Sequence, residues 1–152
     1  MWKKWLKLGL IVGAGLFLLI QLVPYGRAHD NPPVTQAAKF PTQQSQDLMK
    51  QSCGDCHSNQ TDWRWYSNVA PASWLVTQDV NGGRENLNFS EWDKPQPELN
   101  ELIEQIQSGG MPPLKYTLPH PSAKLSDTEK KQLIAALKAL YATDPPTIKA
   151  GG

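Results

Sequence analysis

From Gln51 to Asn59 the chain reads QSCGDCHSN, and the five residues Cys53-Gly54-Asp55-Cys56-His57 within this stretch decide how the rest is interpreted. They contain both cysteines of the 152-residue chain. A disulfide between thiols so close in sequence would close a very small loop and add little stability. A disulfide framework is therefore not expected, and the two thiols with the adjoining imidazole indicate a chemical role.

Two cysteines three positions apart, followed directly by histidine, form the C-x-x-C-H pattern of c-type haem attachment. Cys53 and Cys56 can reach the two vinyl groups of one haem, and His57 can turn its imidazole onto the iron of that ring. A structural zinc site would need a fourth protein ligand, and a thioredoxin-like dithiol would need a βαβ context that the sequence lacks. We therefore predict one haem c, attached covalently through both cysteines, with His57 as a ligand of the iron.

The pattern of apolar residues predicts an all-α fold, a cytochrome c-like haem domain with long loops. A helix should run from about Thr42 into the cysteine motif. Three further helices are expected at residues 72–80, ending at Asn81-Gly82-Gly83; at residues 97–109; and from Ser126, which forms an S-x-x-E capping box with Glu129, to about residue 144. No segment alternates in the manner of a β-strand.

Residues 1–28 are interpreted as a membrane anchor or signal segment. An uncharged apolar run from Leu8 to Val23 follows the basic flank Met-Trp-Lys-Lys-Trp-Leu-Lys. This arrangement favours one N-terminal transmembrane helix, with the haem domain on the periplasmic side of a bacterial inner membrane, while a cleaved signal peptide is the alternative. Residues 29–41 would then be a Pro-rich linker, residues 42–144 the c-type haem-binding domain, and residues 145–152 a flexible tail.

The charge distribution bears on the partners. The net charge of the whole chain is +1, but all 14 acidic residues follow residue 28, whereas four of the 15 basic residues precede it. The part that follows the N-terminal segment is therefore acidic overall and lacks the basic stripe that nucleic-acid binding requires. We expect the membrane and redox proteins in or at it as partners, and no nucleic acid.

The sixth ligand of the iron has two main candidates. Met111 stands between Gly109-Gly110 and Pro112-Pro113, on a rigid loop between two predicted helices that could present its thioether; the alternative is a methionine that fills a gap in the core. His120 lies between two prolines, where it could ligate the iron or form a hydrogen bond with a haem propionate or the backbone. Met111 is the preferred metal ligand.

The sequence resembles the bacterial haem-binding domain family, whose members are similar to small single-haem c-type cytochromes. The resemblance covers about residues 30–142. It is carried by Cys53-Gly-Asp-Cys-His-Ser-Asn, Thr61, Trp65-Tyr66-Ser67, Ala70-Pro71, Ser73-Trp74, Asp79-Val80, Gly83-Arg84, Leu87-Asn88-Phe89-Ser90, Met111-Pro112-Pro113 and Leu125-Ser126. Arg64 departs from the family pattern, which tends to have proline before the Trp-Tyr pair.

The resemblance implies further haem contacts. In cytochromes c a proline carbonyl after the haem histidine commonly accepts the proton of its Nδ1, and Pro71 stands at the corresponding distance from His57; it could equally serve only to start a helix. Trp74, Arg84 and Tyr116 could donate hydrogen bonds to the haem propionates, or be ordinary surface or core residues.

We expect a non-enzymatic electron carrier, because histidine and methionine together saturate the iron and leave no open position for a substrate. The alternative is a haem enzyme or gas-binding sensor, peroxidase-like, with an open or displaceable sixth site. A protein whose haem only supports its fold is a third possibility.

Overall fold

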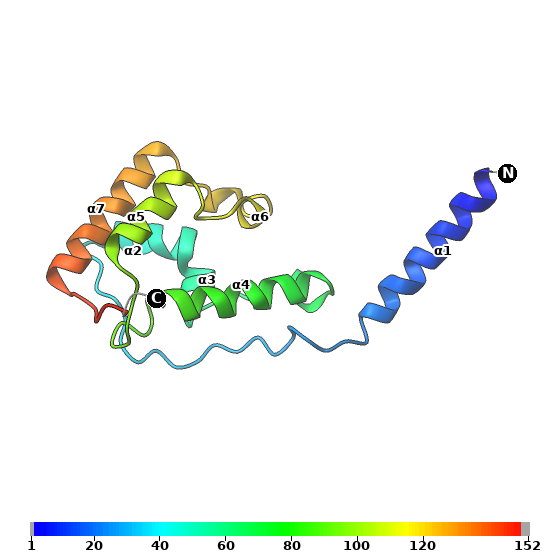
Figure 1. Cartoon of the computed structure of the whole chain (residues 1–152), viewed down its shortest axis with the longest axis horizontal. Helices are drawn as coiled ribbons and strands as arrows, with labels where there is room; N and C mark the ends of the chain where they lie inside the picture. The colour runs from blue at the N-terminus through cyan, green and yellow to red at the C-terminus, as the bar shows by residue number, and fades with distance from the viewer. Residues whose placement is uncertain (1, 150–152) are drawn as a thin grey trace. The chain divides into compact units, whose positions relative to one another are not determined.

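The computed structural model describes residues 2–149, and within them it is helical and contains no β-strand (Figure 1). Its elements are α1 (Trp2–Ile20), α2 (Gln43–Met49), the π-helical segment η1 (Lys50–Gly54), α3 (Asp55–His57), the short 3₁₀ helix η2 (Trp65–Asn68), α4 (Ala72–Asn86), α5 (Leu99–Ser108), α6 (Leu114–Thr117), the 3₁₀ helix η3 (Pro121–Ala123) and α7 (Asp127–Thr143). The described chain forms two units. The first comprises residues 2–30 and 63–79, and the second residues 31–62 and 80–149.

Helix α1 overturns the predicted membrane anchor. Among residues 2–149, no helix has both the length and the apolar character needed to cross a membrane. The 19 residues of α1 include three lysines, so its uncharged part begins only at Leu8 and ends with the helix at Ile20. That is short of the roughly 20 apolar residues that span a bilayer. The prediction of an N-terminal transmembrane helix, and with it of a single-pass inner-membrane protein with a periplasmic haem domain, is therefore wrong.

In the first unit, the segment after α1 is held by polar contacts with residues 63–79. The side-chain amide of Gln21 pairs with both backbone groups of Ala70, at 2.9 Å each. Gly26 has a φ of 83°, and a Cβ there would lie 2.3 Å from the carbonyl oxygen of Ser73. Any other residue here would have a strained backbone, because of the positive φ, and its Cβ would collide with the Ser73 carbonyl.

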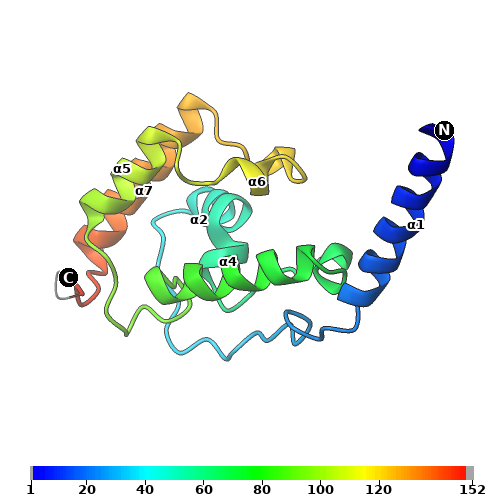
Figure 2. The same ribbon diagram turned by 45° about the vertical axis from the view of Figure 1, so that its right-hand side comes forward.

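The apolar core of the second unit lies where α7 packs against α5 and α2. Figures 1 and 2 show α5 and α7 side by side. Leu133, Leu137 and Leu140 repeat along one face of α7, as helical periodicity requires, and are buried. The ring of Trp92 stacks on Phe89 at 5.8 Å, so the loop that follows α4 completes this core.

Two of the three helices expected after the haem motif occur close to their predicted bounds. α5 ends at Gly109, which has a φ of 78° and so provides the left-handed residue that commonly terminates a helix. α7 begins at Ser126, whose hydroxyl accepts from the N–H of Glu129 while the Glu129 carboxylate accepts from the N–H of Ser126. This is the predicted capping box. The helix expected at residues 72–80 instead continues through the glycine pair to Asn86.

Residues of the expected linker and of the expected tail form backbone hydrogen bonds with the loop after α4. Within the linker, Ala38 is buried and its N–H donates to the carbonyl of Phe89. At the other end, the backbone of Gln96 accepts from Lys149 and donates to Thr147. Backbone pairing with the loop after α4 thus fixes both segments. Residues 150–152 of the expected flexible tail lie outside the described residues.

We expect Leu140→Ala to lower the free energy of unfolding by about 2–5 kcal/mol, because it opens a cavity at a fully buried position. Denaturant titration followed by far-ultraviolet circular dichroism measures the change. Lys138→Ala, on the exposed face of the same helix, is the control and should change stability by less than about 0.5 kcal/mol. Equal effects of the two substitutions would contradict the packing described for α7.

Candidate haem site

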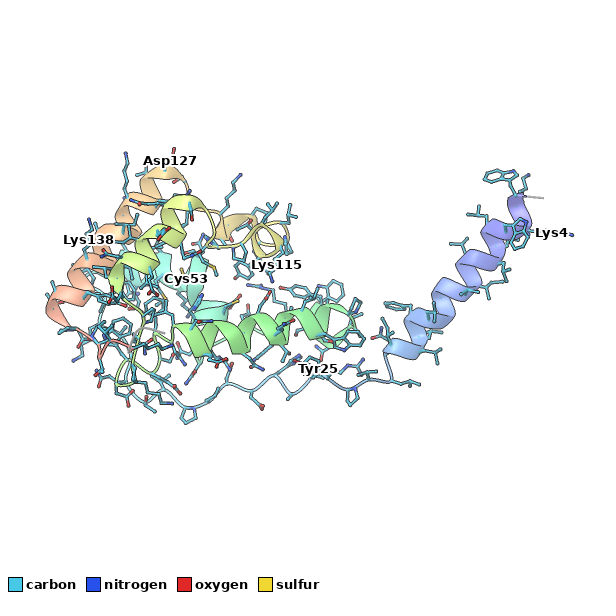
Figure 3. The ribbon with its side chains drawn as sticks, in the orientation of Figure 1. Lys4, Tyr25, Cys53, Lys115, Asp127 and Lys138 are labelled. Carbon is cyan, nitrogen blue, oxygen red and sulfur yellow. The ribbon has the colours of Figure 1, made fainter. Side chains whose placement is uncertain are left out.

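The haem motif lies at the end of one continuous helical run. Thr42 caps α2, whose axis continues through the π-helical segment η1 into the single turn of α3. Cys53 lies in η1, while Cys56 and His57 lie in α3 (Figure 3 labels Cys53). Single π-helical turns of this kind occur frequently at functional sites. The sequence prediction of a helix running into the cysteines is thus met by α2, η1 and α3 together.

The orientation of His57 is fixed by the end of α4 and the loop after it. Its Nδ1 lies 3.0 Å from the carbonyl oxygen of Gly83 and 3.1 Å from that of Leu87. Both partners are acceptors, so Nδ1 carries the proton and donates it, which leaves Nε2 as the nitrogen with a lone pair. The backbone of His57 is held as well, because its carbonyl accepts from the N–H of Phe89 at 2.9 Å.

Burial lowers the pKa of His57 from its ordinary value, and the two carbonyl contacts oppose this only in part. Near neutral pH the ring is therefore uncharged. A neutral imidazole whose Nδ1–H is engaged by backbone carbonyls is the form that binds a metal through Nε2.

Gly83 allows α4 to approach the haem motif at backbone distance. A Cβ at this position would lie 2.4 Å from the carbonyl oxygen of Cys56 and 3.0 Å from its Cβ. Only glycine can be accommodated there without moving one of the two helices. The same contact brings the carbonyls of Gly83 and Leu87 to the ring of His57, so the residue that permits the approach also supplies an acceptor.

The two cysteines are free thiols, and both are partly exposed. Burial raises the pKa of the Cys53 thiol, and a weak contact with the hydroxyl of Ser52, at 3.5 Å, partly offsets the increase. Cys53 is therefore a protonated thiol near neutral pH, and it packs against the apolar core of the second unit.

Arg84 holds the loop that leaves the motif. Its Nε donates to the carbonyl of Ser58 at 2.8 Å, and one terminal nitrogen donates to the hydroxyl of Thr61 and the side-chain carbonyl of Asn31 at 2.8 and 2.9 Å. These bonds join the segments before and after the haem motif to α4. The guanidinium thus connects segments of the protein itself, and a hydrogen bond from Arg84 to a haem propionate stays a prediction.

Tyr116 and His120 lie together against the motif. The hydroxyl of Tyr116 donates to Oδ2 of Asp55 at 2.7 Å. Nδ1 of His120 donates to the carbonyl of Tyr116 at 2.8 Å, and the two rings are 4.4 Å apart between centroids. The hydroxyl of Tyr116 thus contacts a residue between the two cysteines, and its suggested hydrogen bond to a haem propionate stays a prediction. His120, which is buried, forms the backbone hydrogen bond that the sequence allowed for it.

Met111 lies in the same loop as these two residues, the Met111 loop of residues 109–120. Its N–H donates to the carbonyl of Gln105 at 3.0 Å, and its side chain is 38% exposed. The thioether is thus available in the same unit as Cys53, Cys56 and His57.

Pro71 and Trp74, which the family resemblance suggested as haem contacts, lie in the first unit. The carbonyl of Pro71 accepts from the N–H groups of Trp74 and Leu75, so it begins α4, while Nδ1 of His57 has Gly83 and Leu87 as its acceptors. The indole N–H of Trp74 is buried and has no hydrogen-bond acceptor among residues 2–149.

Sequence reasoning missed Gly83, Leu87 and Phe89 as partners of His57. The Gly82-Gly83 pair was the available signal, since a glycine inside a helical pattern often marks a close approach between backbones. We instead expected the pair to end the helix.

These donors suit an iron porphyrin. Two free thiols lie in the motif, and the adjoining imidazole is neutral and keeps Nε2 for a metal. Among the described residues there is no cluster of three or more His, Cys, Asp and Glu side chains that could hold a bare metal ion. The helical fold and this donor set define a haem protein.

Comparisons with known proteins give the family directly. The haem-binding domain family matches residues 15–139, and the chain belongs to that family. The chain is also 29% identical over 96 residues to the cytochrome c peroxidase Ccp of Escherichia coli (strain K12), a match that covers 58% of this chain and 21% of that protein. The chain thus spans about a fifth of the length of this relative. No solved structure matches it significantly.

We expect Gly83→Ala to lower the free energy of unfolding by about 1–3 kcal/mol, because the new methyl group collides with Cys56. The matched control is Gly82→Ala in the same helix, where a Cβ meets no atom within 4 Å. This control should stabilise the protein by up to about 1 kcal/mol, since alanine is the better helix former. Denaturant titration measures both changes. A neutral Gly83→Ala would contradict the close contact between α4 and the haem motif.

Proposed function

We propose that this protein is a single-haem c-type cytochrome that transfers single electrons. Haem would be attached covalently through Cys53 and Cys56, and Nε2 of His57 would bind its iron. The observation that carries the proposal is the pair of contacts from Nδ1 of His57 to the carbonyls of Gly83 and Leu87. They select the tautomer and the orientation that an axial histidine needs, beside the two thiols of a C-x-x-C-H motif.

Bound haem supplies one-electron redox chemistry at its iron. The chain contributes the rest. The two cysteines hold the group in place, and the carbonyls that engage Nδ1 of His57 make this ligand a stronger electron donor. The helical contact at Gly83 keeps the ring from rotating.

Met111 is the proposed sixth ligand. Its side chain is free of hydrogen bonds in the described structure, and its loop is bonded to the haem motif through Tyr116 and Asp55. A thioether favours ferrous iron, and Met111 and His57 together would leave no open position on it. An iron without an open position suits electron exchange with other redox proteins, which are the partners that we propose.

The second candidate is a peroxidase-like function, and the similarity to cytochrome c peroxidase favours it. In that case the sixth position would be open or readily vacated. His120 is buried beside Tyr116 in the Met111 loop and could then take part in the handling of protons. The state of the sixth position distinguishes the two functions.

We predict that haem stays with the polypeptide through acid-acetone extraction, because thioether bonds to Cys53 and Cys56 survive it. The double variant Cys53→Ala/Cys56→Ala should lose its haem to the organic phase. A double variant that retains haem as firmly as the unaltered protein would refute covalent attachment while leaving haem binding intact.

We predict that the oxidised protein is low-spin and shows the weak near-infrared charge-transfer band of thioether-to-iron ligation, and that Met111→Ala abolishes this band. The reduction potential should fall by about 59 mV for each tenfold loss in preference for ferrous iron. Leu114→Ala, which truncates an exposed side chain on the same loop, is the control and should leave the band and the potential unchanged.

Other outcomes point elsewhere. A resting protein that is already high-spin and reacts rapidly with peroxide would replace the electron carrier by the peroxidase-like candidate. Spectra typical of two histidine ligands, lost in His120→Ala and kept in Met111→Ala, would move the sixth ligand to His120.

A further inference from the structure

We propose that the hydrogen bond between the Tyr116 hydroxyl and the Asp55 carboxylate is a positioning contact that holds the Met111 loop, residues 109–120, closed over the sixth coordination position. The inference rests on the proposed haem binding and deepens it, since it assigns to two residues the control of access to the iron. Neither residue is a ligand. Asp55 acts from inside the haem motif and Tyr116 from inside the loop.

The acceptor is held firmly on the side of the haem motif. The second carboxylate oxygen of Asp55 accepts from the N–H of Asp62 at 3.1 Å, and the backbone carbonyl of Asp55 accepts from the hydroxyl of Thr61 at 2.6 Å. The side chain therefore directs Oδ2 at the loop from a fixed position. Because Asp55 lies between Cys53 and Cys56, whatever it holds is held directly to the haem-attachment segment.

The donor is equally well fixed inside the loop. The N–H of Tyr116 donates to the carbonyl of Pro113 at 2.9 Å, which starts the short helix α6. The carbonyl of Tyr116 accepts from Nδ1 of His120, and the two rings are in contact. Tyr116 thus connects the part of the loop that follows Met111 with the part that leads to His120, so that fixing its hydroxyl fixes the loop as a whole.

The two leucines that flank Tyr116 contribute little to this task. Leu114 in α6 and Leu118, which follows α6, are 71% and 70% exposed. Beyond the loop, the side-chain amide of Gln51 donates to the carbonyl of Ser122, which anchors the segment after His120. The bond from Tyr116 to Asp55 is a direct polar contact between the loop and the haem motif, so its loss should raise the fraction of molecules with an open loop.

The test uses the haem-loaded full chain and the variant Tyr116→Phe, which keeps the ring and removes only the hydroxyl. We expect carbon monoxide to bind the reduced protein, and imidazole the oxidised protein, about tenfold faster than in the unaltered protein. Tyr141→Phe is the matched control, because it removes a hydroxyl that donates at 2.8 Å to the carbonyl of Pro97, away from the loop. It should leave both rates unchanged.

A second measurement does not depend on iron ligation. Lys115 is exposed in α6, so trypsin cleavage after this residue reports opening of the loop (Figure 3). Tyr116→Phe should accelerate this cleavage about tenfold, and Asp55→Ala at least as much, because it also removes the acceptor of the Asp62 N–H. The double variant should be no faster than Asp55→Ala alone, because the Tyr116 hydroxyl acts through its bond to Asp55. Tyr141→Phe should be cleaved at the rate of the unaltered protein.

Unchanged cleavage in both Tyr116→Phe and Asp55→Ala would overturn the proposal, as would additive effects in the double variant. Faster cleavage with unchanged ligand binding would show that the loop does not guard the iron, which also overturns it. If the unaltered protein lacks the thioether band, the ligation by Met111 fails instead, and the cleavage rates alone decide the role of the Asp55–Tyr116 bond.

Discussion

The contact between the backbones of Gly83 and Cys56 is the constraint on which the site depends. It brings α4 against α3 so closely that two carbonyls of the α4 end reach the imidazole of His57. A side chain at position 83 would separate the helices and remove both acceptors at once. The orientation of the His57 ring thus depends on the lack of a side chain at position 83, which contributes no functional group of its own.

Two kinds of interaction stabilise the second unit. The leucines of α7 with Phe89 and Trp92 provide the apolar core, against which Cys53 also packs. Hydrogen bonds from Thr61 and Tyr116 hold Asp55 in the haem motif, and Arg84 holds the loop that follows it. Hydrogen bonds are directional, so they suit a segment whose side chains would have to face haem at defined angles in the proposed function.

The sequence allowed prediction of the features that depend on local chemistry. The capping box at Ser126, the glycine end of α5 and the helical run into Cys53 all follow from residues close together in the chain. The course of α4 does not, because the preference of glycine to end a helix is outweighed by packing against a distant segment. The acceptors of His57 are backbone carbonyls, which every residue type carries, so the glycine pair at 82 and 83 indicates a close approach there but does not name the acceptors.

The pairing of Gln96 with the C-terminal segment has a consequence for how the protein is made. The backbone of Gln96 is bonded to Thr147 and Lys149, while its side chain accepts from the N–H of Asn88. The loop after α4 contains Phe89, whose N–H donates to the carbonyl of His57. This loop is thus hydrogen-bonded to residues some fifty positions later in the chain. Because Thr147 and Lys149 are synthesised long after Gln96, this loop can acquire its final contacts only after the C-terminal segment has left the ribosome.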